Sequence, residues 1–122
     1  MSAGTYNLLI EQGATWSRVF TYKDSAGAPI DLTGYIARLT AVTSYGGDLI
    51  IEATVDNGRV VMGDEDGTIT ITIEAADTAE LDAPIEGVYD LEIEAGMGGE
   101  VSRLIQGRVT VSPEAVAAEV AP

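Results

Sequence analysis

Clustered carboxylates are the side chains whose types and spacing could do chemistry in this sequence. The loop Asp64-Glu65-Asp66, with Asp56 and Asn57 upstream, offers oxygen ligands of the kind that Ca²⁺ prefers. Its spacing does not match the calcium loop of an EF-hand. We therefore predict a solvated turn at Asp64–Asp66, with Ca²⁺ binding as the alternative.

A second set of carboxylates, Asp90, Glu92 and Glu94, alternates with apolar residues. A pair of carboxylates is what a glycosidase needs. Successive outward residues of a strand, however, usually face solvent or a partner, and opposite charge predicts that Asp90 and Glu92 pair with Arg103 or Arg108 across a hairpin. The chain contains no histidine and no cysteine, which removes the commonest general base and the thiolate ligands. We predict no catalytic, cofactor or metal site, and no enzymatic activity.

Four aromatic residues allow two interpretations. Trp16, Phe20, Tyr22 and Tyr35 either stack on a sugar or fill a core, and the core is the commoner use of such residues. Trp16, Arg18, Phe20 and Tyr22 recur with a period of two, which predicts a strand with this face inward. Arg18 interrupts that face, so we interpret it as a snorkelling side chain or as a sign of a sheet edge.

The elements that must position these side chains are short strands separated by polar turns. The expected strands are Thr5–Ile10, Trp16–Tyr22, Tyr35–Val42, Leu49–Val55, Arg59–Met62, Thr68–Glu74, Tyr89–Glu94 and Val101–Val111. About eight such strands with one short helical turn predict an all-β fold, an antiparallel immunoglobulin-like β-sandwich. The predicted core is Trp16, Phe20, Leu39, Ile69, Ile71, Ile73, Tyr89, Leu91, Ile93 and Val109.

Local signals add detail to the strand pattern. Asn57-Gly58 between apolar runs predicts a hairpin. The run Ala75–Leu81 favours a helical turn with Asp77 as its candidate cap, and by analogy with immunoglobulin domains Tyr89 is the tyrosine whose hydroxyl ties back to that corner. Gly107 predicts a bulge in the last strand.

Val101, Ile105, Val109 and Val111 are expected to share one face of that last strand. Pro113 ends the strand. Residues 115–122 then form an Ala/Val-rich tail, so the expected organisation is one domain over residues 1–114 followed by a C-terminal arm over residues 115–122.

Composition limits the partners. The 122 residues are 46% hydrophobic and 21% charged, as in globular proteins, and the net charge is −14. Such a surface repels the phosphates of nucleic acids and anionic membranes, so we expect no nucleic-acid and no membrane partner. The first residues lack the pattern of a signal peptide, and no apolar run approaches the ~20 residues of a membrane span.

Three segments carry a resemblance to a known family: IEQGATWSRVFTYKDSAGAPIDLTGYIARL (Ile10–Leu39), NGRVVMGDEDGTITITI (Asn57–Ile73) and GVYDLEIEAGMGGEVSRLIQGRVTVSPE (Gly87–Glu114). Their order and spacing resemble small phage and prophage virion structural proteins, similar to the N-terminal domain of phage baseplate upper proteins. The resemblance extends from about Thr5 to Glu114. It implies a non-enzymatic assembly module, often joined to a receptor-binding part that this sequence does not show.

The expected function is therefore a virion structural protein. It is either a tail or baseplate adaptor or a decoration protein on the capsid exterior, made in the host cytoplasm and bound to other virion proteins and to copies of itself. The alternative is a free-standing module that binds a carbohydrate or cell-surface ligand, with Ca²⁺ as a candidate helper. Edge strands and short terminal arms are the expected means of assembly. The candidate contact residues are Ser2, Ala3, Thr5, Ala115, Val116 and Val120.

Overall fold

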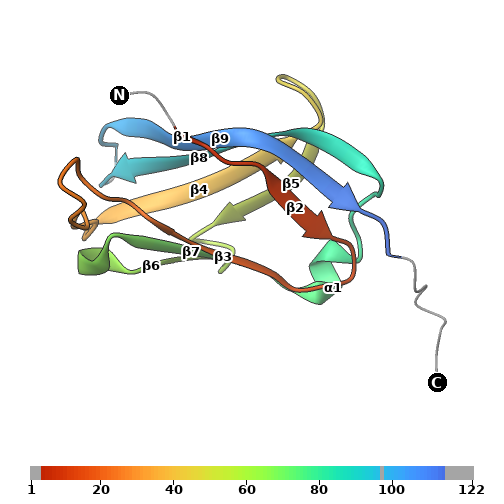
Figure 1. Cartoon of the computed structure of the whole chain (residues 1–122), viewed down its shortest axis with the longest axis horizontal. Coiled ribbons are helices and arrows are strands. Elements are labelled where there is room, and N and C mark those ends of the chain that lie inside the picture. Colours follow the sequence, from red (N-terminus) through yellow and green to blue (C-terminus); the bar gives the residue numbers. More distant parts are fainter. Residues whose placement is uncertain (1–3, 97, 115–122) are drawn as a thin grey trace.

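The computed structural model describes residues 4–96 and 98–114, which form two facing β-sheets (Figure 1). The larger sheet has the order β1-β9-β8-β4-β5, with β2 also paired to β9, and the smaller sheet has the order β3-β7-β6. The larger sheet contains β1 (Gly4–Thr5), β2 (Leu8–Glu11), β4 (Tyr35–Val42), β5 (Leu49–Thr54), β8 (Ile85–Ala95) and β9 (Val101–Ser112). The smaller sheet contains β3 (Trp16–Thr21), β6 (Val60–Met62) and β7 (Thr68–Ile73).

The predicted immunoglobulin-like sandwich is confirmed. The order β9-β8-β4-β5 opposite β3-β7-β6 is the arrangement of an immunoglobulin domain. In such a domain the strands equivalent to β8 and β9 lie in one sheet with those equivalent to β4 and β5. Two pairings depart from the expected antiparallel pattern. Both β1 and β2 run parallel to β9, so the single N-terminal strand expected over Thr5–Ile10 is two short strands.

The core lies between the sheets and follows the period of two. Ile69, Ile71 and Ile73 on β7 are fully buried, and the corresponding residues of β8 face them. Nine of the ten predicted core residues are buried: Trp16, Leu39, Ile69, Ile71, Ile73, Tyr89, Leu91, Ile93 and Val109. Phe20 is only partly buried because β3 is an edge strand, and its ring lies beside the open side of the sandwich.

The bulge in β9 lies three residues before the position that the sequence indicates. Leu91 is opposite Ile105 and Glu92 is opposite Arg103, so Leu104 is the extra residue. A bulge reverses the alternation of faces beyond it. Val101 therefore shares the outer face with Glu94 and is 46% exposed, and the prediction that it joins Val109 on the inner face is wrong.

Gly107 has a different role from the one predicted. It lies opposite Tyr89 in regular register. A Cβ atom at this position would overlap the main-chain carbonyl oxygen of Tyr6. The glycine is required because the chain between β1 and β2 passes close over β9 here.

Asn57-Gly58 does not form the predicted hairpin. β5 belongs to the larger sheet and β6 to the smaller one, so the turn carries the chain from one sheet to the other. Asn57 organises this crossover with its side chain, whose Oδ1 accepts hydrogen bonds from the main-chain nitrogens of Thr54 and Arg59 at 3.0 Å each. Asn-Gly indicates a tight turn of either kind, because the asparagine side chain bonds back to the nearby backbone and Gly58 adopts a φ of 81°.

The corner between β7 and β8 also differs in its details. The helix α1 spans Ala75–Thr78 and its N-cap is Glu74, so the prediction that Asp77 is the cap is wrong. The carboxylate of Asp77 forms an ion pair with Arg59 at 3.1 Å instead. The hydroxyl of Tyr89 bonds Tyr6 rather than this corner. Thr78, fully buried, holds the corner. Its hydroxyl donates to Ala14 O at 2.8 Å or Ala75 O at 3.1 Å, and accepts from Gly13 N at 3.1 Å.

Candidate assembly surface

The acidic loop forms a 3₁₀ turn, η1 (Asp64–Asp66), with a role in the fold. The carbonyl of Asp64 accepts hydrogen bonds from the main-chain nitrogens of Leu32 at 2.8 Å and Gly67 at 3.1 Å. Leu32 is fully buried, so this bond fastens the loop before β4 to the smaller sheet. In the part of the chain that the structure describes, no three acidic, histidine or cysteine side chains are grouped to hold a metal ion.

The carboxylates of β8 form a ladder of ion pairs on the outer face of the larger sheet. Arg38, on the neighbouring β4, donates from Nε to Glu92 at 3.2 Å and from Nη1 to Glu94 at 3.1 Å. The predicted cross-hairpin pair is present between Asp90 and Arg103 at 3.5 Å, while Arg108 pairs with Glu86 at 2.9 Å.

The ladder also sets the proton affinities of its members. The hydrogen bond from Arg38 lowers the pKa of Glu94 below its ordinary value. Burial, followed by the charge of Glu92, raises the pKa of Asp90, and Arg103 opposes that rise. The ion pairs of Arg38 were not predicted from the sequence, because they depend on β4 lying beside β8 in the sheet.

A groove of about 940 Å³ opens on the side of the sandwich where β3 ends. We call it the β3 groove. Its two walls are β3 with the residues that follow it, and β1 with the first half of β9. The lining residues are Gly4, Phe20, Thr21, Tyr22, Lys23, Ile69, Glu92, Val101, Ser102, Arg103, Leu104, Ile105 and Gln106. A smaller hollow continues it along β3 and is lined by Tyr6, Arg18, Val19, Phe20, Thr21 and Ile105.

The wall formed by β3 is an unpaired strand edge. β3 pairs with β7 on one side, and within residues 4–96 and 98–114 no strand pairs with its other side. Tyr22 N donates to Gly67 O at 2.8 Å, and Thr72 N donates across the sheet to Arg59 O at 2.9 Å. Because hydrogen bonding alternates along an antiparallel ladder, the backbone groups of Ser17, Val19 and Thr21 point away from β7. These three residues define the open edge.

Arg18 lies across this edge, as one of the two sequence interpretations predicted. Its Nη1 donates to the outward-pointing carbonyl of Ser17 at 2.8 Å, and its guanidinium lies 5.5 Å from the centre of the Trp16 ring. A charged side chain on an edge strand discourages unspecific pairing with other chains. Arg18 is exposed and is the side chain that covers this edge.

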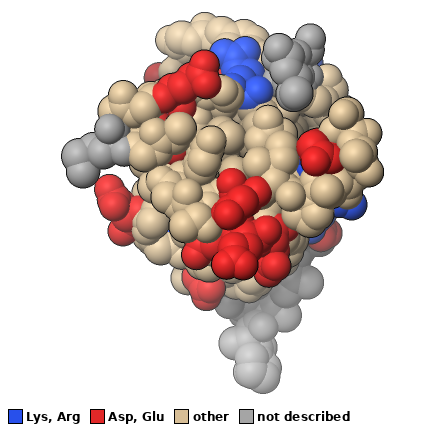
Figure 2. Space-filling model, turned by 90° about the vertical axis from the view of Figure 1, so that its left-hand side faces the viewer, with Lys and Arg blue, Asp and Glu red and all other residues tan. Residues whose placement is uncertain are grey.

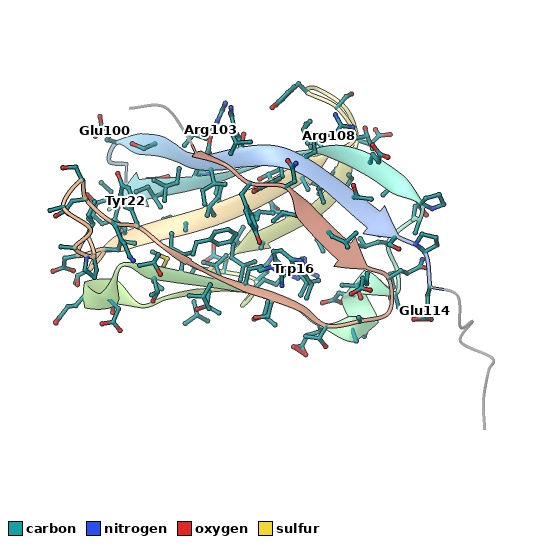
Figure 3. All side chains as sticks on the ribbon, in the orientation of Figure 1. Trp16, Tyr22, Glu100, Arg103, Arg108 and Glu114 are labelled. Carbon is teal, nitrogen blue, oxygen red and sulfur yellow. The ribbon has the colours of Figure 1, made fainter. Side chains whose placement is uncertain are left out.

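Cations gather around the groove in a chain that has few of them. Lys23 and Arg103 line it and Arg18 lines the smaller hollow along β3; together they are half of the six Lys and Arg residues in a protein of net charge −14. Figure 3 shows Tyr22 and Arg103 at the same end of the sandwich, with Glu114 at the opposite end. Figure 2 looks at the end that holds η1, where acidic side chains gather low on the face and basic ones lie at its upper rim.

Of the residues predicted as assembly contacts, Thr5 is described. It is exposed, lies in β1 and pairs with Gln106 of β9. The other five, Ser2, Ala3, Ala115, Val116 and Val120, lie outside the described residues. The open edge and the β3 groove were not assigned from sequence, although Arg18 within an apolar alternation was a usable signal for the edge.

Comparisons with known proteins bear on the fold. No protein-family model and no curated protein matches the chain. Among solved structures, it is similar to the N-terminal domain of phage TP901-1 ORF48, with a TM-score of 0.52 and 13% sequence identity over 92% of this chain and 99% of that one. It also matches the extracellular domain of the voltage-gated sodium channel beta4 subunit, with a TM-score of 0.49 and 12% identity over 93% and 97%. The first likeness shows that the two chains share a β-sandwich fold.

Proposed function

We propose that this protein is a non-enzymatic structural protein of a bacteriophage virion. In this role it is an assembly or adaptor module of the tail or baseplate, or a decoration protein on the capsid exterior. The observation that carries the proposal is the fold shared with the phage TP901-1 ORF48 domain, which covers 92% of this chain and 99% of that one. The segments Ile10–Leu39, Asn57–Ile73 and Gly87–Glu114, which resemble phage virion proteins, agree with it.

The described surface fits a protein that works by contact. The clustered carboxylates are engaged in ion pairs or exposed on a turn, and the acidic loop supports the fold through its backbone. The β3 groove is wide, open and bordered by an unpaired strand edge, which suits an extended protein segment better than a small substrate. The net charge of −14 suits a position away from packaged DNA.

Purified particles test the proposal. Phage released from a host that carries the gene are banded on a density gradient, and the protein is quantified against the major capsid protein by mass spectrometry. We expect it in a fixed ratio through successive gradients. An abundant host cytoplasmic protein, followed through the same gradients, is the control for carry-over. Absence of the protein from particles that infect normally contradicts the proposal.

A glycan array separates the alternative. If the protein is absent from particles and binds a defined sugar with millimolar Ca²⁺ present, the carbohydrate-binding module is the better assignment. The expected result is no sugar binding above that of the Asp64→Ala/Asp66→Ala variant. The comparison is direct because those two carboxylates are the candidate Ca²⁺ ligands predicted from sequence.

A further inference from the structure

We propose that residues 115–122 of one copy bind the open edge of β3 in a second copy as an added strand. The inference deepens the proposed function, because it rests on the protein working as repeated copies.

The open edge offers the hydrogen bonds. Along one side of β3, the backbone groups of Ser17, Val19 and Thr21 pair with no other strand of the described chain, and the carbonyl of Ser17 accepts from the Arg18 side chain. An extended segment satisfies such backbone groups by joining the sheet. β3 has six residues, a length of about 20 Å, whereas eight extended residues span about 26 Å. Residues 115–122 are therefore long enough to cover the whole edge.

The side chains of the segment fit the two faces of an added strand. Its sequence is AVAAEVAP, so Val116, Ala118 and Val120 fall on one face with a period of two. That face is apolar and matches the β3 groove, where Phe20, Leu104 and Ile105 are only partly buried. The other face carries Glu119, the one charged residue of the segment, while the Arg18 guanidinium lies across the edge at the carbonyl of Ser17.

We assign the segment to a second copy because the proposed function holds repeated copies of the protein side by side. Within one copy, Gln12 donates to Leu81 O at 2.9 Å and accepts from Glu114 N at 2.9 Å, so Glu114 lies against the connection between β2 and β3, at the end of the sandwich where β3 begins. The test below therefore includes a variant that separates binding within one copy from binding between two copies.

Disulfide exchange between two single-cysteine variants tests the proposal in the full chain. The protein has no cysteine, so each introduced thiol is unique. Val19→Cys is activated as the mixed disulfide with thionitrobenzoate and mixed with Ala117→Cys. The thiolate of residue 117 attacks the sulfur at residue 19, the disulfide between copies forms, and thionitrobenzoate leaves and is measured by its colour.

Val61→Cys is the matched control. Val19 and Val61 lie opposite Thr70 on its two sides, at the two edges of the same sheet, and are 60% and 61% exposed. We expect Ala117→Cys to react at least about tenfold faster with activated Val19→Cys than with activated Val61→Cys, because pairing raises the local thiol concentration. Equal rates overturn the proposal.

Three further arms exclude other occupants. Arg18→Glu should slow the reaction, whereas Arg108→Glu, which lies in an exposed pair with Glu86, should not. If a double variant Val19→Cys/Ala117→Cys closes within single molecules at high dilution, the segment binds its own copy and the proposal is wrong. If two Val19→Cys chains react with each other faster than either reacts with Ala117→Cys, the edge pairs with itself and the proposal is again wrong.

The outcome is separable from the virion test. Protein that is present in particles but reacts equally at residues 19 and 61 refutes the strand addition alone. Protein that reacts selectively at residue 19 but is missing from particles refutes the virion role alone.

Discussion

The hydroxyl of Tyr89 on β8 donates a hydrogen bond to the main-chain carbonyl of Tyr6, 83 positions earlier in the chain. Tyr6 lies between β1 and β2, where the chain crosses β9 above Gly107. The hydrogen bond thus ties β8 to the connection between β1 and β2. It helps to hold Tyr6, which lines the smaller hollow along β3, in its place above β9.

Tyr89→Phe should destabilise the protein by about 1–2 kcal/mol, because the buried ring stays while the hydrogen bond to Tyr6 is lost. Urea denaturation at neutral pH measures the change. Tyr45→Phe is the control, since Tyr45 is 70% exposed, and it should leave the free energy of unfolding unchanged. A Tyr89→Phe variant as stable as the parent would show that the carbonyl of Tyr6 is equally well satisfied by water.

The same residue predicts a pH dependence. Burial raises the pKa of Tyr89 to about 12 from 10.0. The folded state therefore favours the protonated phenol more than the unfolded state does, so this stabilisation is complete below pH 10 and is lost as the pH rises toward 12. The difference in unfolding free energy between the parent and Tyr89→Phe should shrink across that window. A constant difference would contradict the raised pKa.

Gly107→Ala should cost about 1–3 kcal/mol, because the new methyl group overlaps the carbonyl oxygen of Tyr6 and pushes the N-terminal strands away from β9. Gly4→Ala is the matched control. Its Cβ would lie 3.7 Å from Leu104 O, an ordinary contact, so that variant should unfold like the parent. Equal stabilities of the two variants in urea would show that the crossing above β9 is looser than the structure indicates.

Ile71→Ala should cost about 2–5 kcal/mol, because Ile71 is fully buried at the centre of β7 and its truncation leaves a cavity. Val19→Ala on the neighbouring strand is 60% exposed and should change the stability by less than about 0.5 kcal/mol. Chemical denaturation of both variants tests the register of the smaller sheet. A small effect of Ile71→Ala would mean that the isoleucines of β7 do not face the core.

Millimolar Ca²⁺ should leave the melting temperature unchanged. The loop Asp64–Asp66 is a 3₁₀ turn whose backbone already serves the fold, and the described residues contain no group of three candidate ligands. Thermal melts with Ca²⁺ and with a chelator make the comparison. A rise of several degrees that Asp64→Ala/Asp66→Ala abolishes would assign a calcium site to this loop.

The fold class was predictable because burial alternates cleanly along β7 and β8. The spacing of Ile69, Ile71 and Ile73 indicates a strand with one buried face, and the spacing of Leu91 and Ile93 indicates another. The features that the sequence did not predict depend on which strands are neighbours in the two sheets. Asn57-Gly58 indicates a turn equally well within a sheet and between sheets, and the parallel pairing of β2 with β9 joins residues about a hundred positions apart.

The candidate surface was harder to foresee for the same reason. An open edge is a property of the strand order, and β3 looks like any other strand apart from Arg18. The bulge at Leu104 changed the face of Val101 because one extra residue reverses the alternation. Arg38 is paired because β4 happens to lie beside β8. In each case the sequence shows the residue type, but it does not show which residues of other strands lie beside it.

The parallel ladder between β2 and β9 has a mechanical consequence. The described chain enters at one end of the sandwich with Gly4 and leaves at the other with Glu114 (Figure 1). A pull applied through these ends draws β2 and β9 in opposite directions along their length, from Leu8 opposite Val109 to Glu11 opposite Ser112. The hydrogen bonds between them lie across the pull and are loaded in shear, so they must yield together instead of opening one at a time. We therefore expect the described domain to resist a pull applied through these two ends.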